Sequence, residues 1–271
     1  MMSNNVLLSQ RDSHIIKGIA IALVVVSHIH RICMLPDKLE PFLNPCGYLG
    51  VALFLFISGY GCMSSVSPNS LNTLYKRIFR VVKPLFYITV ITFLLMLSFN
   101  ETPSIKYMFL QSVGLNNTMC SACWYITFQY FCYIGFLLLG KESSFHKVLL
   151  WALTFSLTIL LISCLYEIDG VLFNLWGLNA FSFCAGVSVA RMSANKIKKI
   201  SLKAGLSLFV TFVCLFVCAY FVFHNPEEYV LRNPLKSMVS LSFVLCICFL
   251  ITFLSNKDVV YEKLGETVRK P

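Results

Sequence analysis

The chain has 271 residues, of which 58% are hydrophobic and only 13% are charged. Soluble domains contain roughly twice that share of charged residues and need polar side chains to cover their surface, so the composition excludes a soluble globular protein. The formal net charge of +10 is divided among short segments between apolar stretches. This pattern orients membrane helices, and it excludes a nucleic-acid-binding protein, in which basic residues gather on one soluble face.

Apolar segments long enough to cross a bilayer predict eight transmembrane helices. In chain order they lie at about 15–34, 47–66, 84–100, 122–140, 148–166, 171–190, 204–223 and 235–255. The third is short, and the sixth contains Asn174 and Asn179, so we expect either to be tilted, kinked or partly re-entrant. The predicted fold class is all-α, a polytopic transmembrane helix bundle, with residues 1–271 forming a single membrane domain.

Lysine and arginine residues are distributed unevenly between the two sides of this predicted membrane protein. All but five of the 22 lie at the two termini or in every second loop, which the positive-inside rule assigns to the cytoplasm. The sequence therefore predicts that both termini face the cytoplasm. The five on the other side are Arg31, Lys38, Lys106, Arg232 and Lys236.

The first predicted helix contains two ionisable residues, Lys17 near its cytoplasmic end and His28 after the run IAIALVVVS. Their spacing corresponds to about three helical turns and a rise of roughly 16 Å, so both share one face. A cation at the cytoplasmic end and an imidazole further in suit an elongated anionic substrate such as acyl-coenzyme A. The imidazole can act as general base on an acceptor hydroxyl, or accept the acyl group itself. The alternative is that Lys17 reaches the interface and His28 makes an interhelical hydrogen bond.

The second predicted helix, GYLGVALFLFISGYGC, is rich in glycine, which permits close approach of a neighbouring helix or local unwinding. Ser58 and Tyr60 add polar groups beside Gly59. Taken alone, the segment indicates helix packing rather than chemistry.

The run YKRIFRVVKP places Arg77 and Arg80 three residues apart, so that they share a face of a helical turn. Two guanidinium groups at the cytoplasmic surface form a suitable phosphate clamp. The alternative is an ordinary positive-inside anchor or a lipid headgroup contact. Trp124 and Tyr125 begin the fourth segment, where an aromatic belt at the interface is the default interpretation.

Cys120 and Cys123 form a CxxC pair in a predicted external loop, where they could form a disulfide or bind a metal ion. Most of the twelve cysteines lie inside apolar spans and are interpreted as small apolar residues of the core. No pair of histidine or acidic residues has ligand spacing within one span, so no metal is predicted.

Taken together and in order, four segments resemble the bacterial acyltransferase-3 family of integral membrane O-acyltransferases. They are IKGIAIALVVVSHIH, with its basic residue and histidine; GYLGVALFLFISGY, ending in Ser-Gly-aromatic; KRIFRVVKPLF, with Arg-x-x-Arg before proline; and CWYITFQYF, a Trp-aromatic helix. The motifs cover about half of the chain, roughly residues 11–140, and later helices match only in general character.

The resemblance implies acyl transfer, usually of acetyl from acetyl-coenzyme A, to a hydroxyl of a cell-envelope glycan, polysaccharide or lipid-linked sugar. It further implies a multi-pass protein of the bacterial cytoplasmic membrane, surrounded by lipid and without a nucleic-acid partner. Its residue assignments are His28 as the catalytic residue, Lys17, Arg77 and Arg80 as donor-binding cations, and Ser58, Gly59, Tyr60 and Trp124 as residues that shape the site.

The chain departs from the family pattern in two respects. Lys17 stands where arginine is usual and lacks its bidentate fork, so donor binding there is weaker or differently arranged. Family members are also longer, and the C-terminal YEKLGE resembles the start of a further helix, so a C-terminally truncated member lacking the family's last helices is expected. Two alternatives follow: a non-catalytic truncated member, or a proton-coupled transporter or flippase in which His28 relays protons.

Overall fold

The computed structural model describes residues 7–33, 36–65, 71–101, 104–117, 120–139, 144–165, 168, 171–192, 202–223 and 229–268. These residues are overwhelmingly helical, and the one β-type pairing recorded among them is an isolated bridge between Ile168 and Val171. The all-α fold class predicted from composition is confirmed.

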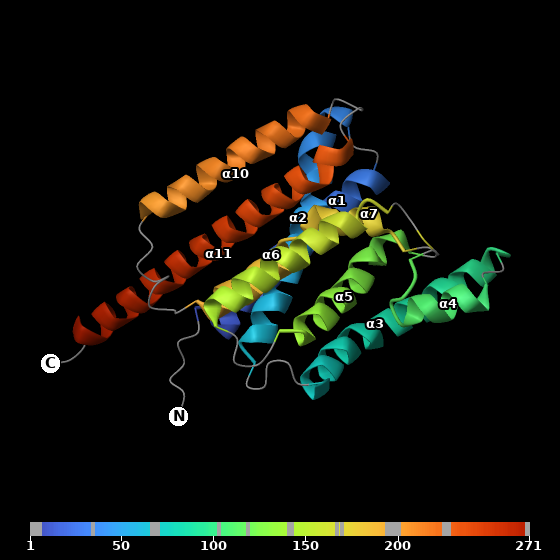
Figure 1. Ribbon diagram of the computed structural model, residues 1–271, viewed down its shortest axis with the longest axis horizontal. Helices are drawn as coiled ribbons and strands as arrows, with labels where there is room; N and C mark the ends of the chain where they lie inside the picture. The colour runs from blue at the N-terminus through green and yellow to red at the C-terminus, as the bar shows by residue number, and fades with distance from the viewer. Residues whose placement is uncertain are drawn as a thin grey trace.

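The helices are long and connected by short segments (Figure 1). In chain order the elements are α1 (Gln10–Ile32), η1 (Asp37–Leu39), α2 (Glu40–Met63), α3 (Leu71–Ser98), α4 (Ile105–Ser112), η2 (Ser121–Cys123), α5 (Trp124–Leu137), α6 (Phe145–Ile162), α7 (Phe173–Trp176), η3 (Gly177–Asn179), α8 (Ser182–Arg191), α10 (Leu202–Phe223) and α11 (Tyr229–Val268).

Six segments of the described chain are long and apolar enough to cross a membrane. They correspond to α1, α2, α3, α6, the α7–η3–α8 segment and α11, and α10 contributes a further apolar stretch, Gly205–Val217. The predicted span 122–140 is shorter than expected, because α5 has 14 residues and a length of about 21 Å, against about 30 Å for the hydrocarbon core. The start of α1 and the end of α11 lie at the same end of the bundle, as an even number of crossings requires (Figure 1).

The sixth predicted span is interrupted, as its two asparagines indicated. The 3-10 turn η3 separates α7 from α8, and α11 supplies hydrogen bonds to the backbone groups around this break. Ser240 Oγ donates to the Leu178 carbonyl at 3.0 Å, and Ser237 Oγ accepts from the Phe181 N–H at 3.4 Å. Backbone groups freed inside a membrane require such partners because lipid offers none.

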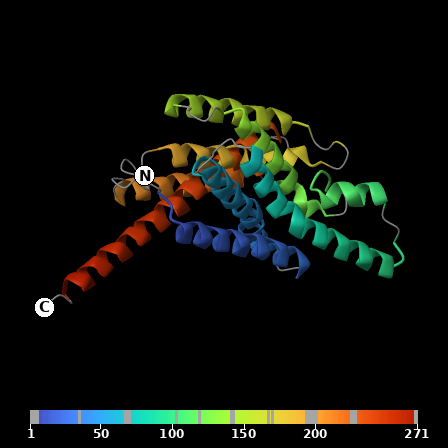
Figure 2. The ribbon, with the colours of Figure 1, turned by 90° about the horizontal axis from the view of Figure 1, so that it is seen from below.

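The C-terminal YEKLGE does not begin a further helix among the described residues. It continues α11, which runs for 40 residues, or about 60 Å, and extends beyond the neighbouring helices at the end where α1 begins (Figures 1 and 2). The predicted start of a new helix at this position is therefore wrong.

The helices α1 and α2 are antiparallel and closely packed because glycines on α2 leave no side chain between them. A Cβ on Gly50 would lie 2.7 Å from the Ala20 carbonyl oxygen, and one on Gly47 would lie 2.7 Å from Ser27 Oγ. A capping box between Ser9 and Asp12 fixes the start of α1. These contacts fix the orientation of α1 about its own axis, and so they determine which of its side chains remain exposed.

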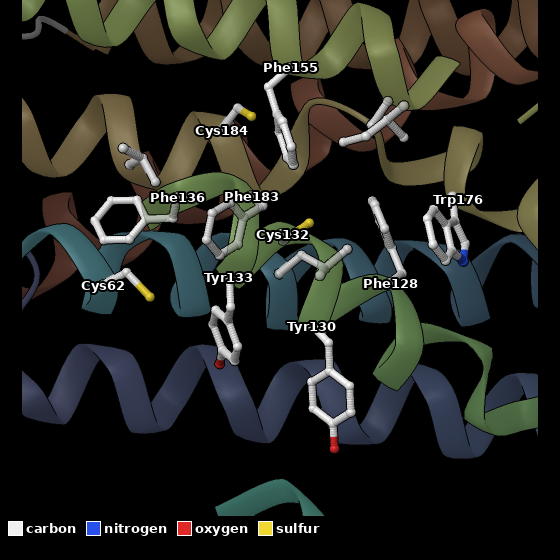
Figure 3. Packing of buried hydrophobic residues seen from close by; sticks show 14 of the residues in the cluster. Cys62, Phe128, Tyr130, Cys132, Tyr133, Phe136, Phe155, Trp176, Phe183 and Cys184 are labelled. Atoms are coloured by element: carbon white, nitrogen blue, oxygen red, sulfur yellow. The ribbon is translucent and has the colours of Figure 1, made fainter. Parts of the chain in front are cut away.

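Buried apolar side chains form two main clusters. The first contains aromatic residues of α5, which pack toward α6 and α8 (Figure 3). The second joins α1, α2 and α11 around Ile16, Phe56 and Val244. By contrast, α3 lies at one edge of the bundle (Figure 2) and buries only Leu85 and Thr89, while most of its apolar side chains are exposed. Such outward apolar faces suit lipid rather than water.

Candidate active site

Three of the four family-like segments meet near the C-terminal end of α2. Gln129 of α5 is buried, and its Nε2 donates hydrogen bonds to Ser58 Oγ at 2.7 Å and to the Tyr133 hydroxyl at 2.9 Å. Gln129 and Tyr133 lie one helical turn apart on α5, so both reach the same point on α2. Ser58, Gln129 and Tyr133 are called the α2–α5 polar network below.

Arg77 of α3 contacts the neighbouring turn of α2. Its Nη2 donates to the Gly61 carbonyl oxygen at 2.5 Å, and Gly61 lies one turn beyond Ser58. Gly61 also leaves room for the guanidinium, because a Cβ there would lie 3.3 Å from Arg77 Nη1. Arg80 is exposed, so the structure brings Arg77 to the network and leaves Arg80 at the surface of α3.

Gly59 and Tyr60 both have contacts that fix α2 in the bundle. Gly59 is buried against α8, where a Cβ would meet the Phe183 carbonyl oxygen. Tyr60 is buried, and its hydroxyl accepts a hydrogen bond from the Leu8 N–H at 2.9 Å, which holds the segment before α1 against the end of α2. Both contacts are structural, and they hold the turn of α2 that follows Ser58 against α8 and against the segment before α1.

Trp124 begins α5 and stacks on Phe128 with ring centroids 6.5 Å apart. Phe128 in turn stacks on Trp176 of α7 at 5.3 Å. Phe128 and Trp176 appear in the aromatic packing of Figure 3. Trp124 is half-buried and thus lies at the end of an aromatic column rather than only in an interfacial belt.

Lys17 and His28 lie on one face of α1, which also contains the exposed side chains of Ile21 and Val25. The adjacent face, with Ile16 and Ala20, packs against α2. Within the described part of the chain, neither Lys17 nor His28 makes a hydrogen bond or ion pair. The α1 face that contains both residues is therefore open to a ligand or to lipid.

His28 and the α2–α5 polar network lie at different levels of the bundle. Ser27, the residue before His28, is buried against Gly47 of α2. Gly47 is eleven residues, or about 16 Å, before Ser58 along α2. The other end of α1 is the one near the network, since Leu8 bonds to Tyr60. The structure thus gathers Ser58, Gly59, Tyr60 and Arg77 at one level and leaves His28 about three turns away.

The CxxC pair lies in the segment before α5. The Cys123 thiol donates a hydrogen bond to Cys120 Sγ at 3.4 Å, and the Cys120 N–H donates to Gln111 Oε1 at 3.0 Å. The hydrogen bond to Cys120, followed by burial, raises the pKa of the Cys123 thiol well above its usual range. No group of three or more metal-binding side chains occurs among the residues that the structure describes, so these contacts give no support to a metal site.

Sequence reasoning missed Gln129 and Tyr133, which complete the network. The available signal was a glutamine in the apolar segment CWYITFQYF, followed four residues later by a tyrosine on the same helical face. An uncharged polar side chain in such a segment requires an internal partner. Only the packing of α5 against α2 identifies that partner as Ser58.

The fold and this network define a multi-pass membrane protein with hydrogen-bonding side chains between helices whose outer faces are apolar. A family model described as an acyltransferase domain matches residues 12–266, so the chain belongs to the acyltransferase-3 family. It is therefore a membrane acyltransferase by family, and the resemblance found from four motifs is confirmed. Comparison with curated proteins and with solved structures produced no match.

Proposed function

We propose that the protein is an O-acetyltransferase of the bacterial cytoplasmic membrane. Its donor is acetyl-coenzyme A, and its acceptor is a hydroxyl of a cell-envelope glycan or a lipid-linked sugar. His28 is the catalytic residue, and Lys17, Arg77 and Arg80 bind the phosphates of the donor. The single observation that supports this proposal most is the placement of Lys17 and His28 on one exposed face of α1, within a chain that belongs to an acyltransferase family.

The separation of the charged and catalytic groups supports an elongated donor. Arg77 lies at the end of α2 near Ser58, whereas His28 lies about 16 Å further along the bundle. Coenzyme A thioesters have their phosphates at one end and their reactive carbonyl at the other. An ionisable side chain in a membrane helix also requires a polar surrounding, which a bound substrate supplies at the exposed face of α1.

Two reaction sequences fit an imidazole at this position. In the first, His28 accepts the proton of the acceptor hydroxyl while the hydroxyl oxygen attacks the thioester carbonyl. The bond from the carbonyl carbon to sulfur then breaks, and the sulfur takes up that proton from His28, so that coenzyme A leaves as a thiol. In the second, a ring nitrogen of His28 attacks the thioester, forms an acyl-imidazole and releases coenzyme A, and the acceptor hydroxyl then takes the acyl group. Both consume one acetyl-coenzyme A and release one coenzyme A for each ester formed.

The test uses the purified full chain in lipid nanodiscs with radiolabelled acetyl-coenzyme A and a membrane fraction that contains candidate acceptors. We expect acetyl transfer by the wild type and its loss, by about a hundredfold or more, in His28→Ala. His14→Ala is the matched control, because His14 is an exposed histidine of the same helix, and it should retain activity. Rapid removal of free donor at neutral pH from a reaction without acceptor distinguishes the two sequences, since only the second leaves label on the protein and an acyl-imidazole is hydrolysed rapidly in acid.

Equal transfer by His28→Ala and wild type would overturn the assignment of His28. Binding of coenzyme A without turnover, in the presence of every acceptor fraction, would indicate a non-catalytic family member. Proton-coupled uptake of an unmodified sugar into proteoliposomes would instead indicate a transporter, whose use of His28 would be a proton relay.

A further inference from the structure

Cys120 and Cys123 form a motif that the proposed acyl transfer does not use. Their sulfur atoms lie 3.4 Å apart, with the Cys123 thiol as hydrogen-bond donor. The Cys123 N–H also donates to the Cys120 carbonyl oxygen at 3.0 Å, which closes the turn η2. A turn of this kind holds its first and fourth Cα atoms within about 7 Å, and a disulfide requires about 4.4–6.8 Å. The backbone around the pair therefore already has the shape that a disulfide needs.

Hydrogen bonds to the helices on either side hold the pair in this arrangement. The Cys120 N–H donates to the Gln111 side-chain oxygen at 3.0 Å, and Gln111 is fully buried on α4. Thr127 Oγ1 of α5 donates to the Gly114 carbonyl oxygen at 2.7 Å, which ties the start of the connecting segment to α5. The two sulfur atoms are thus held together by the fold around them as well as by their spacing in the chain.

The pair is accessible and belongs to the side of the membrane on which disulfides persist. Both cysteines are half-buried rather than buried. Arg77 and Arg80 lie near the start of α3, whereas Cys120 follows the segment beyond its other end. The positive-inside rule assigns the start of α3 to the cytoplasm, and so it assigns the pair to the opposite side. Surroundings outside the cytoplasm are oxidising, while cytosolic thiols are kept reduced.

The direction of the hydrogen bond between the two sulfur atoms distinguishes their roles. Cys120 Sγ accepts the bond, and a donor directed at a sulfur stabilises its thiolate form. The same bond raises the pKa of the Cys123 thiol well above its usual range. Thiol–disulfide exchange begins with attack by a thiolate. Cys120 is therefore suited to attack first, and Cys123 is suited to complete the exchange.

We infer that Cys120 and Cys123 are a redox-active pair that forms an intramolecular disulfide by exchange with a disulfide oxidant on the outer side of the membrane. The Cys120 thiolate attacks one sulfur of the oxidant, the oxidant's S–S bond breaks, and one half leaves as a thiol after taking up a proton. Cys123 then loses its proton to water, and its sulfur attacks Cys120 Sγ and releases the second half as a thiol. Two protein thiols become one disulfide, and the oxidant is reduced to two thiols. This site is separate from acyl transfer.

The first test follows the pair by peptide mass spectrometry. The full chain in lipid nanodiscs is reduced, separated from the reductant and incubated with oxidised glutathione at neutral pH, and the remaining thiols are then alkylated. We expect the peptide with Cys120 and Cys123 to lose two hydrogens, to stay unalkylated and to return to the dithiol on renewed reduction. Cys164 is the matched control, because it is exposed and its thiol donates to the Leu160 carbonyl, so it should bear only glutathione or the alkyl group.

The second test examines the order of attack with variants of Cys123. Without a second thiol, Cys120 should keep one glutathione in both Cys123→Ser and Cys123→Ala. The serine hydroxyl can still donate to Cys120 Sγ and alanine cannot, so we expect Cys120 to react about threefold or more faster in Cys123→Ser. Thermal unfolding of both variants in the reduced state separates this effect from a change in the fold. Equal rates would overturn the assignment of Cys120 as the first nucleophile.

The third test establishes the side of the membrane. A membrane-impermeant maleimide is added to reduced vesicles of defined orientation, and we expect at least about tenfold more labelling of the pair in right-side-out than in inside-out vesicles. The opposite result would overturn the inference, as would a wild-type pair that stays fully alkylated, or keeps glutathione, after the first test. Each readout is independent of acetyl transfer, so these failures would leave the proposed function in place.

Discussion

Gly59 of α2 and Gly186 of α8 are placed so that each faces the backbone of the other helix. A Cβ on Gly59 would meet the Phe183 carbonyl oxygen, and a Cβ on Gly186 would meet the Phe56 carbonyl oxygen. Gly59 lies one turn after Phe56 on α2, and Gly186 lies one turn after Phe183 on α8. Each glycine therefore follows the carbonyl that the other glycine faces. The contact is therefore reciprocal, and it brings the two helices closer than side chains would allow.

This contact predicts that Gly59→Ala and Gly186→Ala each destabilise the fold by about 1–3 kcal/mol or more, since backbone rather than a flexible side chain must move. Gly18→Ala is the matched control, because a Cβ on Gly18 has nothing within 4 Å, and it should be neutral or slightly stabilising. Thermal unfolding in detergent measures all three. Equal effects of Gly18→Ala and Gly59→Ala would contradict the explanation.

Arg77 and Arg80 should differ in their effect on stability. Arg77 donates to the Gly61 carbonyl near the end of α2, and hydrogen bonds to charged groups contribute about 1.5–3 kcal/mol. Half-exposure of Arg77 reduces that value, so we expect Arg77→Ala to lower the thermal midpoint measurably. Arg80 is exposed, and Arg80→Ala should leave the midpoint unchanged. A loss of coenzyme A binding in Arg80→Ala would then report a donor contact directly.

The break between α7 and α8 should be sensitive to α11. Ser237→Ala leaves the Phe181 N–H without its partner inside the membrane domain, which should cost about 1–3 kcal/mol. Ser240→Ala removes a donor from the Leu178 carbonyl, and an under-satisfied carbonyl is tolerated better than an orphaned N–H, so its effect should be smaller. Reversal of this order in thermal unfolding would show that the serines act through packing instead.

Cys123 should react slowly with alkylating reagents near neutral pH. Its raised pKa means that the reactive thiolate forms only at higher pH than in an ordinary thiol. Cys120→Ala removes the hydrogen bond that is the largest cause of this shift, so the pKa of Cys123 falls and alkylation at a fixed pH becomes faster. Peptide mass spectrometry resolves Cys123 from the other cysteines, and an unchanged or slower rate would contradict the prediction.

Several features could be predicted from residue patterns because they depend on local properties of the chain. Uninterrupted apolar stretches identify spans without knowledge of their neighbours, and Asn174 and Asn179 indicated the irregular span correctly. The length of α5 was overestimated, since apolar residues beyond Leu137 continue the composition but not the helix. The YEKLGE segment was also misinterpreted, because a continuing helix and a new one have the same local composition.

The sequence by itself determined that this chain is a helical membrane protein of an acyltransferase family, because bilayer thickness and lipid polarity limit composition directly and ordered motifs identify the family. Only the tertiary structure decided that Gln129 bonds to Ser58, that Arg77 contacts α2 while Arg80 is exposed, and that His28 lies about 16 Å from this level. These relations depend on how the helices pack against one another, and helical periodicity specifies faces without specifying their partners.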